Sequence, residues 1–480
     1  MLQSVPVLTL CFLAGFVGCS LRIAIVGGGI SGTSTAYFLN EILGARVDVT
    51  LFEGSKIGGR LSTISVEGCE YETGGAVIHE KNKYATDLAV KMGLTKMRDD
   101  SSSSEVLGLY ANNEIIFVSS KFSWFNNIKF LWRYGFDVVR LQQFTDNMLK
   151  SFDNVYDVQD KNNSYECLDG LMSAIDPVFL KYMDVSTFDG FKEDGFSSEI
   201  INELIQGTLK VNYGQTTSVH RFVGSVSIAG AGATLFSLEG GNKLLPQKLL
   251  AASKAKLINS FVKEIGQRGK EFTVKTEFNG TSSESQFDYV IISTPLTVDP
   301  ARKNKIQFTG HLADIAVPGN YWTTVCTIVK GDINPHFFGY KSAQDVPDLV
   351  ISVTDSFFNS ISTINPVKSG QSCGTVWKVF SRKRLTDVEI NTLFQSVKFV
   401  QHIDWLAYPH YDVKQHSYNF TLSDGLYYTN ALEWAASAIE MDIIGARNVA
   451  LLLKKKIENY GNISVDEARF STSSIAHDEV

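Results

Sequence analysis

The hydrophobic pattern near the start of the chain predicts a β-α-β unit. Residues 21–26 (LRIAIV) form an apolar, β-branched run that is typical of a buried parallel strand. Residues 33–43 place apolar side chains at helical spacing, and residues 47–52 (VDVTLF) form a second apolar run that ends at Glu53. A strand, a helix and a strand within about thirty residues are what the doubly wound fold requires.

Helical spacing returns in the middle of the chain. Residues 128–152 carry apolar side chains at i, i+3 and i+4, and Gly135 interrupts the pattern, so two helices or one kinked helix are predicted. The basic residues Lys129, Arg133 and Arg140 either face a membrane surface or form the solvated edge of a core-facing helix. We favour the second interpretation and keep peripheral membrane or lipid association as the alternative.

Strands and helices alternate again after residue 239. Residues 239–250 (EGGNKLLPQKLL) predict a glycine turn leading into a helix, and apolar runs predict strands over 256–265, 271–278 and 287–293. A short strand at 426–429 precedes a long alanine-rich helix, which we expect to end at Lys454-Lys455-Lys456. The predicted fold class is α/β. We expect a discontinuous Rossmann-like domain over residues 21–100, 225–300 and 405–456, a mixed α+β domain over 101–224 and 301–404, and a tail over 457–480.

The first twenty residues differ from the rest. Residues 5–18 form an uncharged apolar run followed by small residues, which predicts a signal peptide over 1–20. A buried N-terminal strand and a lipid anchor on Cys19 are the alternatives. Asn-x-Ser/Thr sequons in polar or turn-like surroundings predict glycosylation and a secretory route. These sequons are at Asn162, Asn279, Asn419 and Asn462.

Composition narrows the function classes. With 480 residues, 44% apolar and 20% charged, the chain is expected to pack as a globular protein. Its net charge of −7 argues against nucleic-acid binding, which needs surplus Lys and Arg. No HExxH or other metal spacing is present, so no metal is predicted. Removal of the leader leaves four cysteines without a C-x-x-C, which allow up to two disulfides in three pairings. These cysteines are Cys69, Cys167, Cys326 and Cys373.

The first motif that indicates a binding function is the glycine fingerprint of Gly27, Gly29 and Gly32. Gly27 permits the tight turn from strand to helix, Gly29 lets the backbone approach a pyrophosphate, and Gly32 lets the helix pack closely on the strand. Glu53 follows about twenty residues later at a strand end, where it can bind a ribose diol and repel a 2′-phosphate. This context predicts a dinucleotide site and disfavours NADP.

Two features favour a flavin over a nicotinamide. Gly58-Gly59-Arg60 resembles a segment of flavin amine oxidases that returns toward the pyrophosphate, where the Arg adds a charge-assisted hydrogen bond. A surface salt bridge is the alternative for Arg60. No second G-x-G-x-x-G follows, so we predict FAD reoxidised directly by oxygen, and therefore an oxidase.

Eight blocks of the chain resemble prenylcysteine oxidases, also called prenylcysteine lyases, and have the same order. The resemblance extends from about residue 22 to about residue 455, and LWRYGF, VNYGQ and WLAYPHY are its most specific parts. It implies an amine-oxidase-like architecture and a lysosomal location. The blocks are VGGGISGTSTAYFL, LFEGSKIGGRLST, EYETGGAVIHEKN, LWRYGF, VNYGQ, SLEGGNKLL, WLAYPHY and LYYTNALEWAASAIEM.

The resemblance implies cleavage of the thioether of S-prenyl-L-cysteine, with farnesyl or geranylgeranyl as the prenyl group. A hydride passes from the prenyl C1 to FAD, water adds beside sulfur, and the hemithioacetal collapses to cysteine and a prenyl aldehyde. Dioxygen reoxidises the flavin and yields hydrogen peroxide. Hydride abstraction beside sulfur needs no strong base, which agrees with the absence of a visible catalytic dyad.

The resemblance also implies roles for single residues. Glu433 and a helix start at Ala435-Ala436-Ser437 match the C-terminal return to the cofactor, and Val262 is a candidate for backbone contact with the adenine. His79 is the catalytic candidate, with a structural histidine as the favoured alternative. Residues matching the FAD-contacting N-terminal blocks are Gly27, Gly29, Gly32, Glu53, Gly59, Arg60, Gly74 and Gly75.

Two expectations concern packing. Trp434 stands where relatives have a smaller residue, and we expect it to alter packing near the flavin. An aromatic-rich segment is expected to supply the pocket for the prenyl tail, with an ordinary core as the alternative. Its members are Phe122, Trp124, Phe125, Phe130, Trp132 and Phe136. The competing functions are another flavin oxidase, such as an amine oxidase, and a non-catalytic flavin- or lipid-binding glycoprotein.

Overall fold

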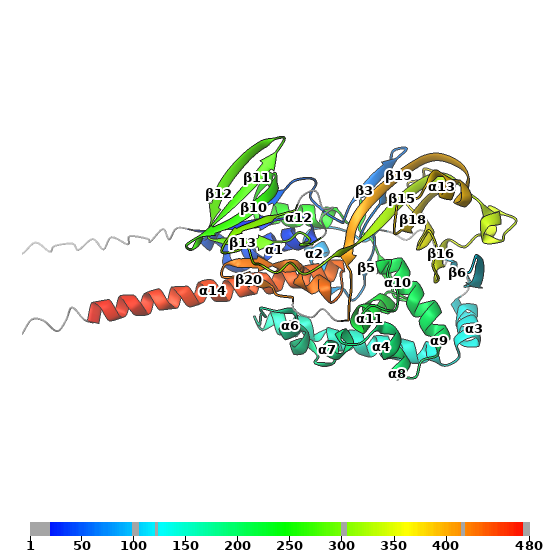
Figure 1. Cartoon of the computed structure of the whole chain (residues 1–480), viewed down its shortest axis with the longest axis horizontal. Coiled ribbons are helices and arrows are strands. Elements are labelled where there is room, and N and C mark those ends of the chain that lie inside the picture. Colours follow the sequence, from blue (N-terminus) through cyan, green and yellow to red (C-terminus); the bar gives the residue numbers. More distant parts are fainter. Residues whose placement is uncertain (1–19, 98–104, 121–122, 299–304, 414–417, 474–480) are drawn as a thin grey trace, which may run out of the picture.

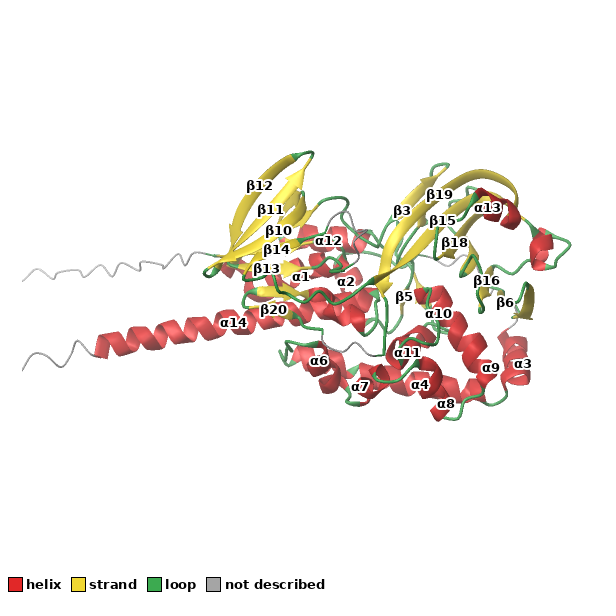
Figure 2. Ribbon diagram, in the orientation of Figure 1, coloured by secondary structure: helices red, strands yellow, loops and turns green. Residues whose placement is uncertain are grey.

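The computed structural model describes residues 20–97, 105–120, 123–298, 305–413 and 418–473. The predicted signal peptide, with Cys11 and Cys19, lies outside these residues except for Ser20. Two large sheets stand side by side above a group of helices, and one long helix extends from the body (Figure 1 and Figure 2).

A six-stranded sheet forms the core of the predicted Rossmann-like domain. Its strands are parallel apart from the edge strand β20. The apolar runs become its central strands because both faces are covered, and Ile23, Ala24 and Ile25 are fully buried. In spatial order the strands are β20 (Thr421–Ser423), β21 (Leu426–Tyr428), β13 (Tyr289–Ile292), β1 (Leu21–Val26), β2 (Val47–Glu53) and β9 (Lys256–Asn259).

Three helices pack around the first strand of this sheet. Helix α1 (Ile30–Leu43) contacts both α12 (Leu244–Ser253) and α14 (Ile439–Ser473). We expected this helix to start at Ala435-Ala436-Ser437 and to end at Lys454-Lys455-Lys456, and both bounds are wrong. It begins at Ile439, after the short helix η5 (Thr429–Trp434), and it continues to Ser473. The lysines did not end it, because no proline or left-handed glycine follows them to terminate the helix.

The predicted strand over 256–265 is two strands. β9 ends at Asn259, and after Ser260 the chain enters β10, which belongs to a separate sheet. That sheet is twisted and lies on the outer side of the six-stranded sheet (Figure 2), and three of its four strands form an antiparallel meander. Its strands, in spatial order, are β12 (Thr281–Phe287), β11 (Glu271–Phe278), β10 (Phe261–Arg268) and β14 (Gln307–Gly310).

A seven-stranded sheet forms the other half of the molecule. Its longest strands pair antiparallel over most of their length. In order they are β19 (Phe394–Pro409), β15 (Tyr321–Ile333), β18 (Val376–Ser381), β17 (Ser360–Ile364), β16 (Leu349–Ser352), β6 (Leu107–Ala111) and β7 (Glu114–Val118). Helix α13 (Asp387–Leu393) precedes β19. Two further strand pairs are antiparallel: the hairpin of β3 (Thr63–Val66) with β4 (Cys69–Glu72), and the pairing of β5 (Ile78–His79) with the distant β8 (Leu235–Phe236).

Helices fill the lower part of the molecule (Figure 1). Gly135, at φ +58°, separates α3 from α4, which confirms the prediction of two helices there. The helices there are α3 (Ser123–Tyr134), α4 (Asp137–Phe152), α5 (Asn154–Asp160), α6 (Leu168–Ile175), α7 (Val178–Met183), α8 (Thr187–Glu193), α9 (Ser198–Ile200), α10 (Gln206–Tyr213) and α11 (Arg221–Ala229), with a π-helical turn, η2 (Ile201–Ile205), before α10. Helix α2 (Lys83–Lys91) lies higher and packs against α14. Within the described ranges no helix combines the length and apolar character needed to cross a membrane.

One disulfide, Cys69–Cys373, ties the β3–β4 hairpin to the loop before β18. Cys167 and Cys326 are free thiols, so only one of the two allowed bonds forms. The six-stranded sheet takes strands from all three segments that we assigned to the first domain. The residue limits of the two domains stay a prediction.

Candidate functional site

A cavity of about 1440 Å³ lies between the two large sheets and the helices. It begins at the carboxyl ends of the parallel strands, where Gly27, Glu53, Ser293 and Asn430 line it. Ligands of open α/β sheets bind at this edge, because the chain leaves the strands there through loops and helix N-termini. From this end the cavity continues among the helices and the seven-stranded sheet.

The turn after β1 is shaped by its glycines. Gly27 has φ +113°, and a Cβ on it would lie 2.6 Å from the Ser293 carbonyl oxygen. A Cβ on Gly32 would lie 2.0 Å from the Gly27 carbonyl oxygen. Gly32 does not line the cavity, and its contact with the turn is the close helix packing that we predicted for it.

The loop of Gly58 and Gly59 lies directly against the first turn. The Gly58 N–H donates to the Gly28 carbonyl at 2.9 Å. Within 4 Å, a Cβ on Gly29 would have only the Gly59 Cα as a neighbour, at 4.0 Å. The backbone at Gly29 therefore faces the open cavity. Two stretches of bare backbone beside a helix N-terminus suit a diphosphate, which needs close approach to N–H groups.

Glu53 lies at the end of β2 and lines the cavity. One of its carboxylate oxygens accepts the Gly28 N–H at 2.8 Å and the other accepts the Ser55 N–H at 2.7 Å. The carboxylate therefore holds the glycine turn and still presents negative charge to the cavity. This placement is the one required for a ribose diol.

Gly74 and Gly75 also line the cavity, opposite the Arg60 backbone. A Cβ on Gly74 would lie 1.9 Å from the Arg60 carbonyl oxygen, and the Gly75 N–H donates to that oxygen at 3.0 Å. Asn242 holds this loop from the other side, because its amide donates to the Gly75 carbonyl at 2.9 Å. The sequence prediction missed Asn242, although a fully buried amide after a glycine pair is a signal for such a role.

Arg60 is the charged centre of the polar end. Its guanidinium pairs with Glu433, donates to the Ala407 carbonyl at 2.8 Å and lies 3.5 Å from Asp442. Glu433 is fully buried and does not line the cavity, whereas Arg60 and Asp442 do. The expected role of Glu433 is therefore corrected: it holds Arg60 instead of facing the cofactor.

Burial and mutual charge set the protonation of this cluster. Burial acts against the charged form of Arg60, but Glu433 and Asp442 outweigh it and keep its pKa well above the ordinary value. Burial likewise opposes ionisation of Glu433, but Arg60 lowers its pKa overall. Burial and the Glu433 charge raise the pKa of Asp442. These shifts favour the charged forms of Arg60 and Glu433 and the protonated form of Asp442.

Two other buried carboxyls line the cavity. Burial raises the pKa of Glu440 to about 7, although the backbone N–H groups of Tyr84 and Ala85 and the Tyr156 hydroxyl all donate to it. Burial also raises the pKa of Glu72 to about 7. Glu72 accepts the Asn242 N–H at 2.6 Å. Both groups titrate near neutrality.

His79 lines the cavity but both ring nitrogens have backbone partners. Nδ1 accepts the Lys81 N–H at 3.0 Å, which leaves Nε2 to donate to the Ala229 carbonyl at 3.2 Å. Burial lowers the pKa of the ring, so the neutral tautomer is favoured. The structural interpretation holds, and we assign His79 no catalytic role.

Val262 and Trp434 lie outside the cavity lining. Val262 is on β10, in the outer sheet, and its expected backbone contact with the adenine stays a prediction. Trp434 stacks on Tyr418 with ring centroids 4.5 Å apart and lies edge-on to Tyr321. Its bulk is accommodated by aromatic neighbours away from the cavity wall.

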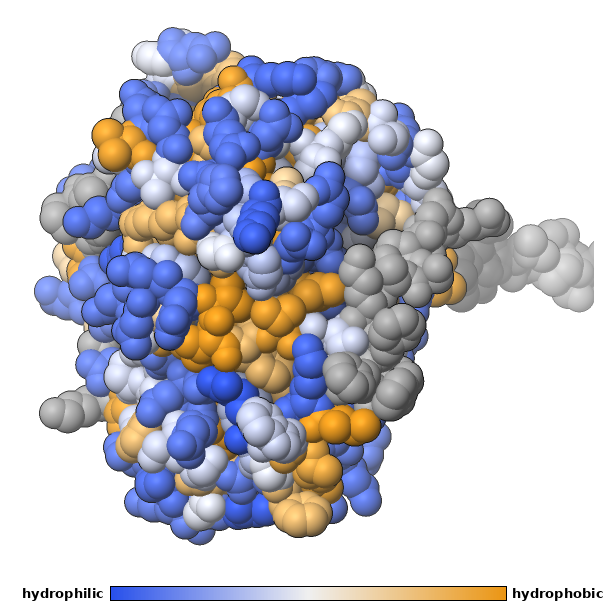
Figure 3. Space-filling model, turned by 90° about the vertical axis from the view of Figure 1, so that its right-hand side faces the viewer, coloured by the Kyte–Doolittle hydropathy of each residue, from blue (hydrophilic) through white to orange (hydrophobic). Residues whose placement is uncertain are grey.

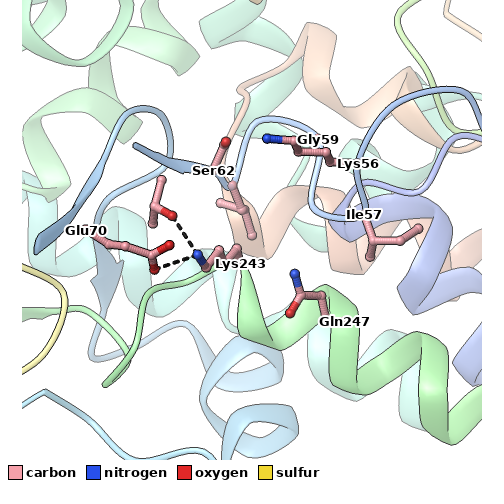
Figure 4. A pocket seen from close by; sticks show the side chains of 9 residues that line it. Lys56, Ile57, Gly59, Ser62, Glu70, Lys243 and Gln247 are labelled. Atoms are coloured by element: carbon pink, nitrogen blue, oxygen red, sulfur yellow. Dashed lines mark hydrogen bonds and ion pairs between the residues drawn. The ribbon is translucent and has the colours of Figure 1, made fainter. Parts of the chain in front are cut away.

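A smaller pocket of about 340 Å³ opens beside Gly59 (Figure 4). Lys243 lies at its edge and donates to Glu70 at 2.7 Å and to the Thr63 hydroxyl at 2.6 Å. These bonds join the start of α12 to the β3–β4 hairpin. The pocket shares Lys56, Gly59, Leu61 and Ser62 with the main cavity, so it is a side branch of the same site.

The far end of the cavity is apolar. Helix α4 contributes a stripe of Val138, Leu141, Thr145, Met148 and Phe152, which repeats at three- and four-residue spacing and could have been found from that repeat. Leu149 of α4 also lines this end. Further apolar lining comes from other elements: Leu107, Leu109, Phe130, Leu204, Val211, Val226, Ile228, Leu349 and Ile351.

The aromatic segment expected to form this pocket contributes only Phe130 to the described lining. Trp132 and Phe136 are 88% and 78% exposed and point away from the cavity. Phe122, and the side chains of Trp124 and Phe125, lie outside what the structure describes. The prediction therefore holds for Phe130 and is wrong for Trp132 and Phe136, because it followed aromatic content and did not consider the stripe on α4.

No group of three or more His, Cys, Asp or Glu side chains able to hold a metal occurs among the described residues.

Two family models match the chain. Residues 117–467 match the model described as prenylcysteine lyase, and residues 25–91 match the NAD(P)-binding Rossmann-like domain. The chain belongs to the prenylcysteine lyase family. Prenylcysteine oxidase 1 of Bos taurus is 33% identical over 452 residues, which cover 90% of this chain and 88% of that relative. Prenylcysteine oxidase 1-like of Homo sapiens is 32% identical, with 90% of each chain covered.

Solved structures share the fold of this family member. Cyclohexylamine oxidase from Brevibacterium oxydans has a TM-score of 0.57 at 13% identity, and the match covers 92% of this chain and 100% of that one. Putrescine oxidase bound to putrescine has a TM-score of 0.54 at 12% identity and covers 92% and 99%. These likenesses confirm the predicted amine-oxidase-like architecture.

The residues of the polar end fit the predicted cofactor. The bare backbone at Gly29 and Gly59, the Glu53 carboxylate and the loop of Gly74 and Gly75 supply a diphosphate contact, a ribose acceptor and a flat surface. Together with the family and the Rossmann-like match, they make the protein an FAD-dependent oxidoreductase of the flavin oxidase type.

Proposed function

We propose that this flavin oxidase cleaves the thioether of S-prenyl-L-cysteine, with farnesyl or geranylgeranyl as the prenyl group. The products are free cysteine, a prenyl aldehyde and hydrogen peroxide. The observation that carries the proposal is the single cavity that joins the glycine loops to a long apolar arm. The relatives named prenylcysteine oxidase 1 support the same substrate.

The apolar arm suits an isoprenoid chain. Its walls come from α4, α10, α11 and the sheet strands β6 and β16, and they present mainly Leu, Val, Ile, Met and Phe side chains. Burying apolar surface stabilises a complex by about 25 cal/mol per Å². An isoprenoid of fifteen or twenty carbons would therefore obtain most of its binding energy there, while its polar cysteinyl end reaches toward the glycine loops.

Bound FAD would supply hydride acceptance and reaction with oxygen. The chain's own residues bind and orient. Glu53 and the glycine loops would hold the cofactor's polar groups, and Glu433 fixes Arg60 at the cavity wall. His79 has both nitrogens engaged, which is compatible with a reaction that needs no strong base.

A peroxide-release assay with farnesylcysteine and spermine tests the substrate. We expect peroxide with farnesylcysteine and not with spermine, together with a prenyl aldehyde identified by mass. Peroxide from spermine alone would assign an amine oxidase activity. Retained flavin with no peroxide from either compound would assign a non-catalytic flavin- or lipid-binding glycoprotein.

We further propose that the protein enters the secretory pathway and resides in the lysosome. Three of the sequon asparagines, Asn162, Asn279 and Asn419, are exposed, and a disulfide agrees with an oxidising compartment. Asn462 lies in α14, in the part whose side chains are not described. Glycosidase digestion of protein from secretory cells should increase its gel mobility, and a tagged chain should colocalise with a lysosomal marker.

A further inference from the structure

Two rows of paired side chains cross the seven-stranded sheet from β18 to β6, and all of them line the cavity. The first row consists of Lys378, Ser362, Leu349 and Leu107. The second row consists of Phe380, Ser360, Ile351 and Leu109. Because residues paired across neighbouring strands point to the same face of a sheet, the two rows form a continuous floor along which a ligand can lie.

This floor changes from charged to apolar along its length. Lys378 on β18 supplies an ammonium group and Ser362 on β17 a hydroxyl, whereas β16 and β6 supply only Leu and Ile side chains to the rows. Neighbouring strands lie about 4.8 Å apart, so the Lys378 and Leu349 backbones are separated by roughly 10 Å. The apolar end is on β6, on the side of the molecule that Figure 3 shows, where hydrophobic side chains gather near the middle of the face. A ligand with one charged end and a long apolar tail matches this floor.

Lys378 is a cation without an anionic partner in the protein. Within the described part of the chain it makes no hydrogen bond or ion pair, and its Nζ lies 5.3 Å from the centroid of the Phe380 ring. By contrast, Lys330 on the neighbouring strand β15 pairs with Glu67. A cation at the wall of a largely apolar cavity is stabilised by an anionic group of a ligand, and the carboxylate of an amino acid is such a group.

Glu72 brings a carboxyl group to the same cavity. It lies at the end of β4 and is 8% exposed. One oxygen accepts the Asn242 N–H at 2.6 Å, and the other has no hydrogen-bond partner among the described residues. Burial raises the pKa of Glu72 to about 7, against the Asn242 hydrogen bond and the positive charge of Lys378, which both lower it. An ammonium group of a ligand would favour the ionised carboxylate in the same way.

A disulfide ties together the two segments that carry these groups. Cys69 is on β4, the strand that ends at Glu72, and Cys373 is in the loop that leads into β18 and Lys378. The bond bridges a sequence separation of 304 residues. It therefore limits the movement of one charged group relative to the other, which a site for a ligand with two charges requires.

We propose that Lys378 binds the α-carboxylate and Glu72 the α-ammonium group of the cysteinyl end of the substrate, while the prenyl chain lies along the two rows toward β6. Gly74 and Gly75 follow closely after Glu72 and line the same cavity, so this orientation brings the sulfur near the loop expected to face the flavin. The inference rests on the proposed function, because it describes how that substrate is oriented.

Changing the protein and the ligand together tests each contact. Calorimetry on the holoenzyme, with its flavin reduced by dithionite so that no turnover occurs, gives the dissociation constant of farnesylcysteine. Lys378→Met should raise this constant about ten-fold, because a charge-assisted hydrogen bond is lost, and should leave that of farnesylcysteine methyl ester unchanged. Glu72→Gln should weaken farnesylcysteine to a similar extent and leave the dissociation constant of N-acetylfarnesylcysteine unchanged.

Two matched variants serve as controls. Lys398→Met and Glu80→Gln remove exposed charges of the same kinds that do not line the cavity. Both should bind the three compounds as wild type does. A flavin-to-protein ratio equal to that of wild type would show that the cofactor site of each variant is intact.

Three results would overturn the inference. One is unchanged affinity of Lys378→Met or Glu72→Gln for farnesylcysteine. Another is equal weakening of farnesylcysteine and of the matched modified compound, which would indicate a structural role for the side chain. The third is loss of flavin from either variant, which would assign the charge to the cofactor site. If wild type shows the expected pattern of binding but releases no peroxide from farnesylcysteine, the inference stands and only the proposed function fails.

Discussion

At the polar end of the cavity the backbone makes the binding surface, whereas at the apolar end side chains from distant helices and strands make it. Gly27, Gly29 and Gly59 leave main chain open to the cofactor, and Glu53 fixes their turn through two backbone N–H groups. The apolar arm has no comparable local unit, since its walls come from four helices and turns of the lower part and from the seven-stranded sheet.

This contrast predicts different sensitivities. A backbone surface tolerates no added atom, so substitutions at its packing positions should abolish cofactor binding and destabilise the fold. A wall of apolar side chains changes shape without unfolding, so substitutions there should alter substrate affinity while flavin stays bound. Four changes separate the two behaviours.

The largest effect is expected from Gly32→Ala. The added Cβ would lie 2.0 Å from the Gly27 carbonyl oxygen, so the turn must move. We expect loss of bound flavin and a fall in the free energy of unfolding of about 3 kcal/mol or more, measured by denaturant titration. Gly170→Ala is the control, because its Cβ would have ordinary contacts starting at 3.4 Å within α6. Flavin retained in Gly32→Ala would contradict the backbone account.

The next effect concerns the Arg60 cluster. Glu433→Gln removes the buried partner of Arg60, and we expect a loss of about 2–3 kcal/mol in the free energy of unfolding. The loss is limited because Asp442, freed from the Glu433 charge, can ionise beside Arg60. Because burial and the Glu433 charge raise the pKa of Asp442 and so favour its protonated form, Asp442→Asn should cost less than about 1 kcal/mol. A larger loss of unfolding free energy for Asp442→Asn than for Glu433→Gln would contradict this assignment, because it would make Asp442 the ionised partner of Arg60.

The apolar arm is tested by Val211→Trp. Val211 lines the arm, and a larger ring there should raise the KM for farnesylcysteine roughly ten-fold, or by about 1.4 kcal/mol. Flavin content should match wild type, because the polar end is untouched. Steady-state kinetics and the flavin-to-protein ratio measure both quantities. Lost flavin with an unchanged KM would contradict this prediction, because it would make Val211 part of the cofactor site and not of the substrate site.

The smallest effect is a pH dependence from Glu72. Its folded-state pKa of about 7 lies above the ordinary value of 4.5, so the folded protein keeps a proton that the unfolded chain has released. The free energy of unfolding should therefore fall as pH rises from about 4.5 to about 7, and Glu440 acts in the same direction. Glu72→Gln should reduce this fall by about 1–2 kcal/mol in melts across that range, whereas the exposed Glu80→Gln should leave it unchanged.

The polar end was predictable because its function depends on residues close together in sequence. A strand, a glycine turn and an acid at the next strand end are local, and the structure places Gly27, Gly29, Glu53, Gly59, Arg60, Gly74 and Gly75 along one cavity. Glu433 was assigned by position in a family block. The direction of a side chain depends on packing that such a block does not contain.

The apolar arm was not predictable in the same way. Helical periodicity identifies which face of α4 is apolar, but not that this face meets β6 and β16 from distant parts of the chain. Aromatic content pointed instead to Trp132 and Phe136, which are exposed. The end of α14 was also misplaced, because favourable charges near a helix terminus stabilise an end without requiring one.

Anaerobic titration of the purified holoenzyme with farnesylcysteine tests the central claim most directly. Reduction of the flavin by this substrate requires the cofactor at the polar end of the cavity and the prenyl chain at the apolar end. Farnesylcysteine should bleach the visible flavin absorbance stoichiometrically. Readmitted oxygen should then restore it with release of peroxide, prenyl aldehyde and cysteine. Flavin absorbance that stays unchanged under excess farnesylcysteine would contradict the account.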